Sequence, residues 1–153
     1  MAMQKKILIM GLPGSGKTTL ANKLVPMLNA VWLNADQVRK EHDDWDFSPQ
    51  GRTRQAERMK RLAQEALDDN RTVIADFVCP TEKTRLDFGA DYVIWMDTIK
   101  EGRFEDTNKM FEEPKHYDYK VTHMDAQMWA FMIKNDIQDK LGPTGPHYGQ
   151  MGQ

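Results

Sequence analysis

The sequence predicts an α/β domain with a mainly parallel central sheet. Short apolar segments alternate with segments whose apolar residues repeat at helical spacing. This alternation is typical of strand–helix–strand units, in which helices cover both faces of a parallel sheet. The 153 residues are enough for one such domain.

The first predicted strand is 6–10, a continuous apolar run that ends at Gly11. A run without alternation indicates a strand buried on both faces. The helix that follows has a leucine at every fourth position over 20–28, and Pro26 should end it near its last turn. The run 31–33 is the next predicted strand.

An acidic, aromatic loop over 41–47 then leads to Ser48 and Pro49, which are typical of an N-cap and the first residue of a helix. That helix carries an apolar stripe over 56–67. Two further strands are expected at 72–75 and 92–96, with a short helix at 81–88 between them.

The charged stretch 101–119 has little periodicity and is expected to be a mobile segment. Asp125 can cap a final helix, and the tail 142–153 is rich in Gly and Pro. The residues expected to share the buried face of that helix are Met128, Trp129, Met132, Ile133 and Ile137. We therefore expect a single domain over 1–141, followed by a flexible tail.

Composition excludes several classes of protein. The formal net charge is −2, which predicts no broad attraction to nucleic acid or to anionic lipid. No apolar run approaches the ~18 residues of a transmembrane helix. The single cysteine, Cys79, cannot form an internal disulfide. A soluble, cytoplasmic domain is the expectation.

The most informative motif is Gly11-Leu12-Pro13-Gly14-Ser15-Gly16-Lys17-Thr18, a complete G-x-x-x-x-G-K-[ST] between a buried strand and an amphipathic helix. Such a loop points its backbone N–H groups at phosphate oxygens, the lysine reaches the β- and γ-phosphates, and the hydroxyl can ligate Mg²⁺. We expect a three-layer P-loop NTPase fold of the nucleoside- and nucleotide-kinase type. The predicted nucleotide-binding residues are Gly11, Pro13, Gly14, Ser15, Gly16, Lys17, Thr18 and Thr19.

Other nucleotide-binding classes fit less well. A GTPase would need Asn-Lys-x-Asp, which is absent. The Asp-Phe-Gly at 87–89 has no accompanying His-Arg-Asp loop, so we interpret it as coincidence. Motors and AAA-type ATPases would need a larger domain. The remaining class is a small kinase with ATP as donor and Mg²⁺ as cofactor.

A kinase needs a carboxylate near the acceptor hydroxyl and cations for an anionic acceptor. Asp36 follows the second predicted strand and is the candidate general base, or the group that holds metal-bound water; its alternative role is to cap the next helix. Arg39 is a candidate clamp for the acceptor. Asp76 ends the third strand and is a rival, either for Mg²⁺ or for a structural hydrogen bond.

Four segments, 31–39, 46–48, 51–52 and 77–80, resemble adenylyl-sulfate (APS) kinase in order and in most spacings, and the likeness runs over roughly residues 7–98. The resemblance implies transfer of the γ-phosphoryl group of ATP to the ribose 3′-hydroxyl of APS. It implies that Asp36 is the catalytic acidic residue. The phosphate-loop motif adds Lys17 as a catalytic residue, and we expect Mg²⁺ to be held by Thr18 and, through water, by Asp36. The substrate-binding residues that the resemblance implies are Arg39, Phe47, Arg52, Gln55, Phe77, Val78, Cys79 and Lys109.

Under this resemblance Phe47 and Phe77 would enclose the acceptor adenine, and a lid at about 101–119 would bring in Lys109 or Arg103. The alternative for the two phenylalanines is ordinary core packing. The chain departs from the family pattern at Asn34, where the family has Asp, and in the lid motif.

Two alternatives stay open. Asn34-Ala35-Asp36 also suits a polynucleotide 5′-hydroxyl kinase, in which Arg39, Arg52 and Arg54 would meet a phosphate backbone. A non-catalytic nucleotide-binding module is the third hypothesis. The expected partners are ATP and a small anionic acceptor, with nucleic acid only under the first alternative, and a homodimer is one of the assemblies left open.

Overall fold

A five-stranded parallel sheet forms the centre of the computed structural model, which describes residues 4–102 and 104–142. The strands are β1 (Lys6–Met10), β2 (Val31–Asn34), β3 (Val73–Asp76), β4 (Tyr92–Met96) and β5 (Tyr119–Val121). Their order in the sheet is β2-β3-β1-β4-β5, and every neighbouring pair is parallel. The predicted α/β class with a three-layer P-loop fold is confirmed.

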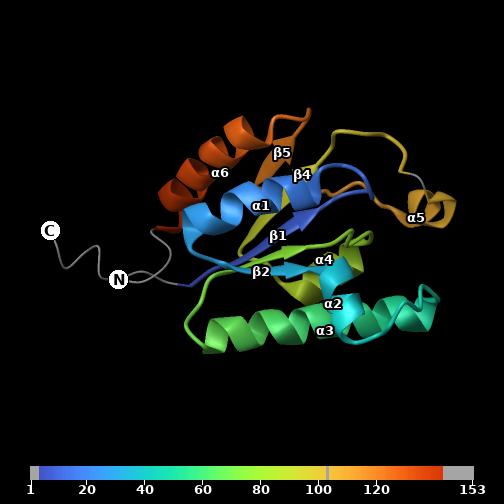
Figure 1. The fold of residues 1–153 in the computed structure, drawn as a ribbon. Coiled ribbons are helices and arrows are strands. Elements are labelled where there is room, and N and C mark those ends of the chain that lie inside the picture. The colour runs from blue at the N-terminus through green and yellow to red at the C-terminus, as the bar shows by residue number, and fades with distance from the viewer. Residues whose placement is uncertain (1–3, 103, 143–153) are drawn as a thin grey trace, which may run out of the picture.

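Helices cover both faces of the sheet. The helices α1 (Lys17–Leu28) and α6 (Ala126–Leu141) lie on one face, and α2 (Ala35–Glu41), α3 (Pro49–Asp68) and α4 (Glu82–Phe88) lie on the other (Figure 1). The short α5 (Glu105–Met110) lies beyond the carboxyl ends of the strands. Ligands of open parallel sheets bind at that edge.

Two hydrophobic cores result from the alternation of side chains along β1. Ile7 and Ile9 face the core beneath α1 and α6, whereas Leu8 and Met10 face the core beneath α2, α3 and α4. All four side chains are fully buried. The uninterrupted apolar run of the first strand is therefore explained by helices on both sides.

Side chains start four of the helices. Ser48, Thr81 and Asp125 accept hydrogen bonds from the first-turn backbone of α3, α4 and α6. The caps at Ser48 and Asp125 were predicted from the sequence. Asn34 caps α2 in the same way, so the capping role considered for Asp36 belongs to Asn34. Asp36 lies in the first turn instead.

Two elements differ from the sequence-based expectation. The stretch 101–119 contains α5, a six-residue helix with no side-chain cap, and it leads directly into β5, which has only three residues. On α6 the buried residues are Ala130, Ile133 and Ile137, whereas Met128 and Met132 are exposed. Packing of α6 on α1 selects the narrower stripe. The predicted tail lies outside the described residues beyond Gly142. No helix among the described residues is long and apolar enough to span a membrane.

Candidate active site

The loop between β1 and α1 is wrapped tightly against its surroundings. Gly11 has φ of 151°, and a Cβ there would lie 2.8 Å from the carbonyl oxygen of Met96. Gly16 has φ of 98° directly before α1, and a Cβ there would lie 2.9 Å from Sδ of Met124. Backbone conformation favours glycine at both positions, and at Gly11 the neighbouring backbone also leaves no space for a side chain. The predicted phosphate loop thus has the curled backbone that the motif demands.

Lys17 lies across the inside of this loop. Its side chain is buried, and Nζ donates hydrogen bonds to the carbonyl oxygens of Gly11 and Leu12, at 2.9 and 3.0 Å. The Ser15 side chain is fully buried, and its Oγ has no hydrogen-bond partner among the described residues. A buried hydroxyl without a partner in a loop of this kind fits a site that a polar group completes.

The remaining residues predicted to bind nucleotide surround Lys17. Pro13 is half-buried, Gly14 is exposed at the tip of the loop, and Thr18 and Thr19 are exposed in the first turn of α1. The backbone N–H groups of Thr18 and Thr19 stand at the positive end of a twelve-residue helix.

Asp76 joins the phosphate loop to β2. The register places Asp76 beside Asn34 at the carboxyl edge of the sheet. Its Oδ2 accepts hydrogen bonds from Asn34 Nδ2 at 2.9 Å, Thr18 Oγ1 at 3.2 Å and Trp32 Nε1 at 3.3 Å. Asp76 is buried, with 2% of its surface exposed. The carboxylate therefore orients the hydroxyl that the motif assigns to Mg²⁺.

This cluster offers the oxygen donors that Mg²⁺ prefers. The Thr18 hydroxyl has one proton and two lone pairs; it donates to Asp76 and accepts from Asn34 Nδ2 at 3.3 Å, which leaves one lone pair. Among the residues that the structure describes, no group of three His, Cys, Asp or Glu is placed to hold a metal by itself. The site fits a metal whose other ligands come from nucleotide and water.

Asp36 lies in the first turn of α2, two residues after Asn34. Asn34 Oδ1 accepts a hydrogen bond from the backbone N–H of Gln37 at 3.0 Å, and this bond starts α2. Asp36 is exposed. Its carboxylate is therefore open to solvent.

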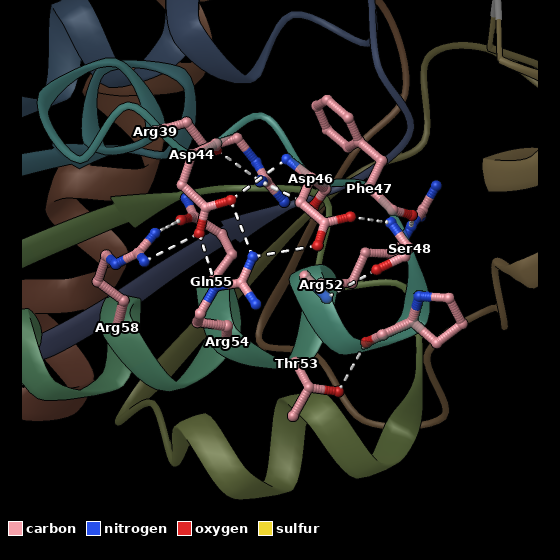
Figure 2. Close-up of polar contacts among 12 residues, drawn as sticks. Arg39, Asp44, Asp46, Phe47, Ser48, Arg52, Thr53, Arg54, Gln55 and Arg58 are labelled. Atoms are coloured by element: carbon pink, nitrogen blue, oxygen red, sulfur yellow. Dashed lines mark hydrogen bonds and ion pairs between the residues drawn. The ribbon is translucent and has the colours of Figure 1, made fainter.

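A network of arginines organises the acidic loop after α2 (Figure 2). Asp44 accepts bidentate hydrogen bonds from Arg54, at 2.8 and 3.0 Å, and a third from Arg58 at 3.0 Å. These hydrogen bonds hold the pKa of Asp44 well below its usual range. Arg54 also pairs with Asp46 at 3.2 Å. Arg39 is buried, and its Nη1 donates to the backbone carbonyl oxygens of Asp44 and Asp46.

Arg39 and Arg52, which are predicted to bind the phosphoryl acceptor, both contact Phe47. Its ring is 53% exposed and lies 4.2 Å from the Arg39 guanidinium carbon. Arg52 donates through Nε to the Phe47 carbonyl oxygen at 2.8 Å, and its Nη1 lies 3.6 Å from Sδ of Met110 in α5. Arg39 and Arg52 pair with no carboxylate in the part of the chain that the structure describes, unlike Arg54. Their charges are balanced by dipoles and a ring, not by an anion.

Other predicted substrate residues have structural contacts. Gln55 is buried and donates to the carbonyl oxygen of Ala35 at 3.0 Å, so it ties α3 to the start of α2. Phe77 is 8% exposed and packs edge-on against Phe88 in the core, with ring centroids 5.4 Å apart. This is the core packing considered as the alternative for Phe77. The two predicted aromatic residues therefore differ, because only Phe47 presents its ring to solvent.

Val78 and Cys79 form the turn after β3. The Val78 carbonyl oxygen accepts from the Gly11 N–H at 3.4 Å, so this turn lies against the phosphate loop. Cys79 is buried, and burial raises the pKa of its thiol to about 12. In this structure Cys79 is a small buried side chain at the end of the turn.

The predicted lid segment lies against the phosphate loop at its base, and its helix α5 contacts Arg52 through Met110. A Cβ on Gly102 would lie 3.1 Å from the Pro13 carbonyl oxygen, so the base of the segment rests on the phosphate loop. Lys109 is exposed and lies 3.9 Å from Glu105 within α5. Arg103, the other proposed lid cation, lies outside the described residues.

The far end of this segment is fixed to α4 by a residue that sequence analysis missed. Arg85 is buried and donates to the carbonyl oxygens of Cys79, Pro80 and Glu112. Desolvation lowers the pKa of Arg85. Asn34 and Trp32 were also not recognised as site residues; the departure from the APS kinase pattern at Asn34 was the available signal.

Two hollows at the surface of the described residues lie near the site. One, of about 140 Å³, lies between the phosphate loop and the lid segment; its lining includes Leu12, Asp97, Asn108, Phe111 and Glu113. The other is a shallow depression along the first turns of α3 and contains no residue of the phosphate loop. The first hollow adjoins the phosphate loop, and the lining of the second includes Arg54.

Comparison with known proteins agrees with this geometry. Residues 7–90 match a family model described as an AAA domain, AAA_33. The match covers more than half of the chain. We set AAA-type ATPases aside because they need a larger domain, but a chain of this length does match this AAA-domain family. A shikimate kinase of Actinobacillus pleuropneumoniae serotype 5b is 26% identical over 121 residues, which are 74% of this chain and 70% of that protein.

Solved structures share the fold. An APS kinase from Mycobacterium tuberculosis in complex with AMPPNP and APS superposes with a TM-score of 0.75 at 20% identity, over 90% of this chain and 99% of that one. A gluconokinase from Sinorhizobium meliloti superposes with a TM-score of 0.62 at 14% identity, over 98% and 99% of the two chains. These neighbours differ in the acceptor that their names imply. The chain therefore belongs to the AAA-domain family, and within that family it is a P-loop kinase, a phosphotransferase.

Proposed function

We propose that this kinase transfers the γ-phosphoryl group of ATP to a hydroxyl group of a small anionic acceptor, with APS as the acceptor and Asp36 as the general base. The observation that carries the proposal is the contact of the Asn34 amide with both Thr18 and Asp76. Asn34 also begins α2, the helix whose first turn contains Asp36, and this supports Asp36 as the base.

The nucleotide is held by the loop backbone and by Lys17. When phosphate oxygens enter the loop, Lys17 Nζ exchanges its two carbonyl partners for them. An ammonium group then faces the β- and γ-phosphates, where negative charge spreads during transfer. The buried Ser15 hydroxyl gains a partner in the same step.

Mg²⁺ would be held by Thr18, with Asp76 and Asp36 acting through water. When bound, the metal neutralises charge on the β- and γ-phosphate oxygens. Asp76 keeps the Thr18 hydroxyl in the orientation that leaves a lone pair outward.

In the reaction, Asp36 takes the proton of the acceptor hydroxyl, whose oxygen forms a bond to the γ-phosphorus. The bond between that phosphorus and the oxygen bridging to the β-phosphate breaks, and ADP leaves. The lid, proposed at about 101–119, excludes water from the site, which suppresses hydrolysis of ATP. We also propose that residues 1–141 form a single kinase domain.

APS as the acceptor is supported by the exposed Phe47 ring and by Arg52. The ring offers a face to an adenine, and Arg52 has no carboxylate partner among the residues described, so it can meet a sulfate or phosphate. A small hydroxy acid of the shikimate type is the second candidate, because the curated relatives carry that name. Such an acceptor needs Arg52 but has no use for an aromatic face.

The test is transfer of labelled γ-phosphate from ATP to a panel of APS, shikimate, gluconate and a 5′-hydroxyl oligonucleotide. The proposal expects a phosphorylated APS product, and it expects Lys17→Ala to abolish transfer while the melting temperature of the chain changes little. Preferred transfer to shikimate would move the assignment to the second candidate. Transfer to no member of the panel would contradict the proposed acceptor class.

A further inference from the structure

The Asn34 side chain contacts Thr18 and Asp76 in addition to capping α2. Its Oδ1 accepts from the Gln37 backbone N–H, and because a backbone N–H can only donate, the other end of the amide must be the –NH₂ group. That group lies 2.9 Å from Asp76 Oδ2 and 3.3 Å from Thr18 Oγ1. The orientation of the amide is thus determined by its hydrogen bonds.

The two oxygens that the amide contacts are spaced like neighbouring ligands of a magnesium ion. Thr18 Oγ1 and Asp76 Oδ2 lie 3.2 Å apart. In an octahedral site with Mg–O distances of 2.0–2.1 Å, adjacent oxygens are about 3 Å apart. Without a third group between them, this hydroxyl and this carboxylate would be a ready-made edge for a cation.

Asp76 Oδ2 is saturated with donors. It accepts from Asn34, Thr18 and Trp32, three hydrogen bonds at an oxygen that has two lone pairs. The Asn34 amide makes the shortest of the three. A cation that approached this oxygen from the side of Asn34 would meet N–H hydrogens, which repel it.

We propose that Asn34 makes cation binding at this site dependent on nucleotide, because its amide keeps Asp76 from ligating a free divalent cation directly. This inference rests on the metal site of the proposed function and identifies Asn34 as the positioning residue of that site. The cation then arrives with the phosphate chain, whose oxygens supply the missing ligands. It also gives a physical meaning to the departure from the APS kinase pattern at position 34.

Asn34→Asp is the decisive variant. An aspartate at position 34 still accepts from the Gln37 N–H and so still caps α2. It removes both amide donors and sets a second carboxylate against Asp76. Cation binding without nucleotide should therefore appear in this variant.

The chain contains a matched control and a reporter. Gln64 donates to Asp68 at 2.9 Å on the exposed face of α3, so Gln64→Glu also replaces an amide by a carboxylate against an aspartate, remote from the phosphate loop. Trp32 Nε1 lies 3.3 Å from Asp76. Excitation of this indole should sensitise the luminescence of a terbium ion bound there.

The experiment titrates the full chain with Tb³⁺, and separately with Mg²⁺, at pH 8 without nucleotide or acceptor. We expect N34D to bind Tb³⁺ at least tenfold more tightly than the unmodified chain and Q64E do. We also expect Mg²⁺ to raise the melting temperature of N34D but not that of the unmodified chain or Q64E. Trp32→Phe in the N34D background should dim the luminescence and leave the Mg²⁺-dependent rise in melting temperature intact. Asn34→Ser, which keeps a cap but adds no carboxylate, should bind Tb³⁺ with intermediate affinity and serves if N34D does not fold.

Equal Tb³⁺ affinity of the unmodified chain and N34D would overturn the inference, as would N34D binding no more tightly than Q64E. Because no nucleotide or acceptor is present, these results are independent of whether the chain phosphorylates APS. A failure of the proposed function would show in the transfer assay and leave the cation titration readable.

Discussion

Gly51→Ala tests whether the acidic loop holds the acceptor. Gly51 is buried in the first turn of α3, and a Cβ there would lie 2.1 Å from the Asp46 carbonyl oxygen and 2.5 Å from Asp46 Cγ. Ordinary contact distances are about 3.5 Å, so the loop must retreat by roughly 1 Å or more. The retreat moves Asp46 and the adjoining Phe47 away from α3, and with them the contact between Phe47 and Arg52.

The expected cost is modest in stability and large in acceptor binding. Overpacking costs about 1–3 kcal/mol, and alanine recovers up to about 1 kcal/mol of helix propensity. The net loss is thus about 0–3 kcal/mol, or up to about 12 °C in melting temperature for a chain of this size. The Michaelis constant for the acceptor should rise about tenfold, because a displacement of this size disrupts substrate positioning, while that for ATP should change less than twofold.

Steady-state kinetics with ATP and the acceptor found in the panel measure both constants. Gln50→Ala, at the exposed neighbouring position, is the control and should leave both unchanged. The fluorescence of Trp45, which lies half-exposed in the same loop, reports whether the loop has moved. A shifted Trp45 spectrum with an unchanged acceptor constant would refute the reasoning.

Two further predictions concern stability. Ile133→Ala should cost about 2–5 kcal/mol because the side chain is fully buried between α6 and α1, whereas Met132→Ala should change stability by less than about 0.5 kcal/mol; comparable losses in urea unfolding would contradict the observed face of α6. Burial raises the pKa of Cys79 to about 12, so the thiol stabilises the fold fully below its unfolded pKa of about 8.5, and this contribution is lost as the pH rises toward 12. The free energy of unfolding, measured by urea titration, should therefore fall between pH 8 and pH 11, by up to about 1.4 kcal/mol per pH unit from this thiol. In Cys79→Ala this free energy should fall less steeply with pH. Equal slopes for the two proteins would show that Cys79 is not the cause.

Elements with a strong local signal were predictable from the sequence. The strand β1 is an unbroken apolar run, and α3 starts with a capping serine and a proline, so each is specified by residues within one segment. The strand β5 and the helix α5 are too short to show a period, and α5 has no side-chain cap. Their formation depends on the neighbouring elements, which a local pattern does not contain.

The same distinction applies to the site. The phosphate loop was predictable because its motif is contiguous and its glycines have a conformational cause. The role of Asn34 depends on Asp76, which lies 42 positions away and comes alongside only through the pairing of β2 with β3. Arg39 was predicted as an acceptor clamp from its position near Asp36, but it lies buried beneath the acidic loop. A sequence pattern identifies charged residues without showing which of them the fold has already paired.

The most direct test of the central claim is the kinetics of Asp36→Asn. This substitution keeps the size of an exposed side chain that makes no ion pair among the described residues. The melting temperature should therefore change little, and the affinity for nucleotide measured without Mg²⁺ should stay within twofold. Phosphoryl transfer to the acceptor should fall at least a hundredfold, because the hydroxyl loses its base. Transfer at the unmodified rate, with nucleotide bound normally, would show that Asp36 activates no hydroxyl and would contradict the account.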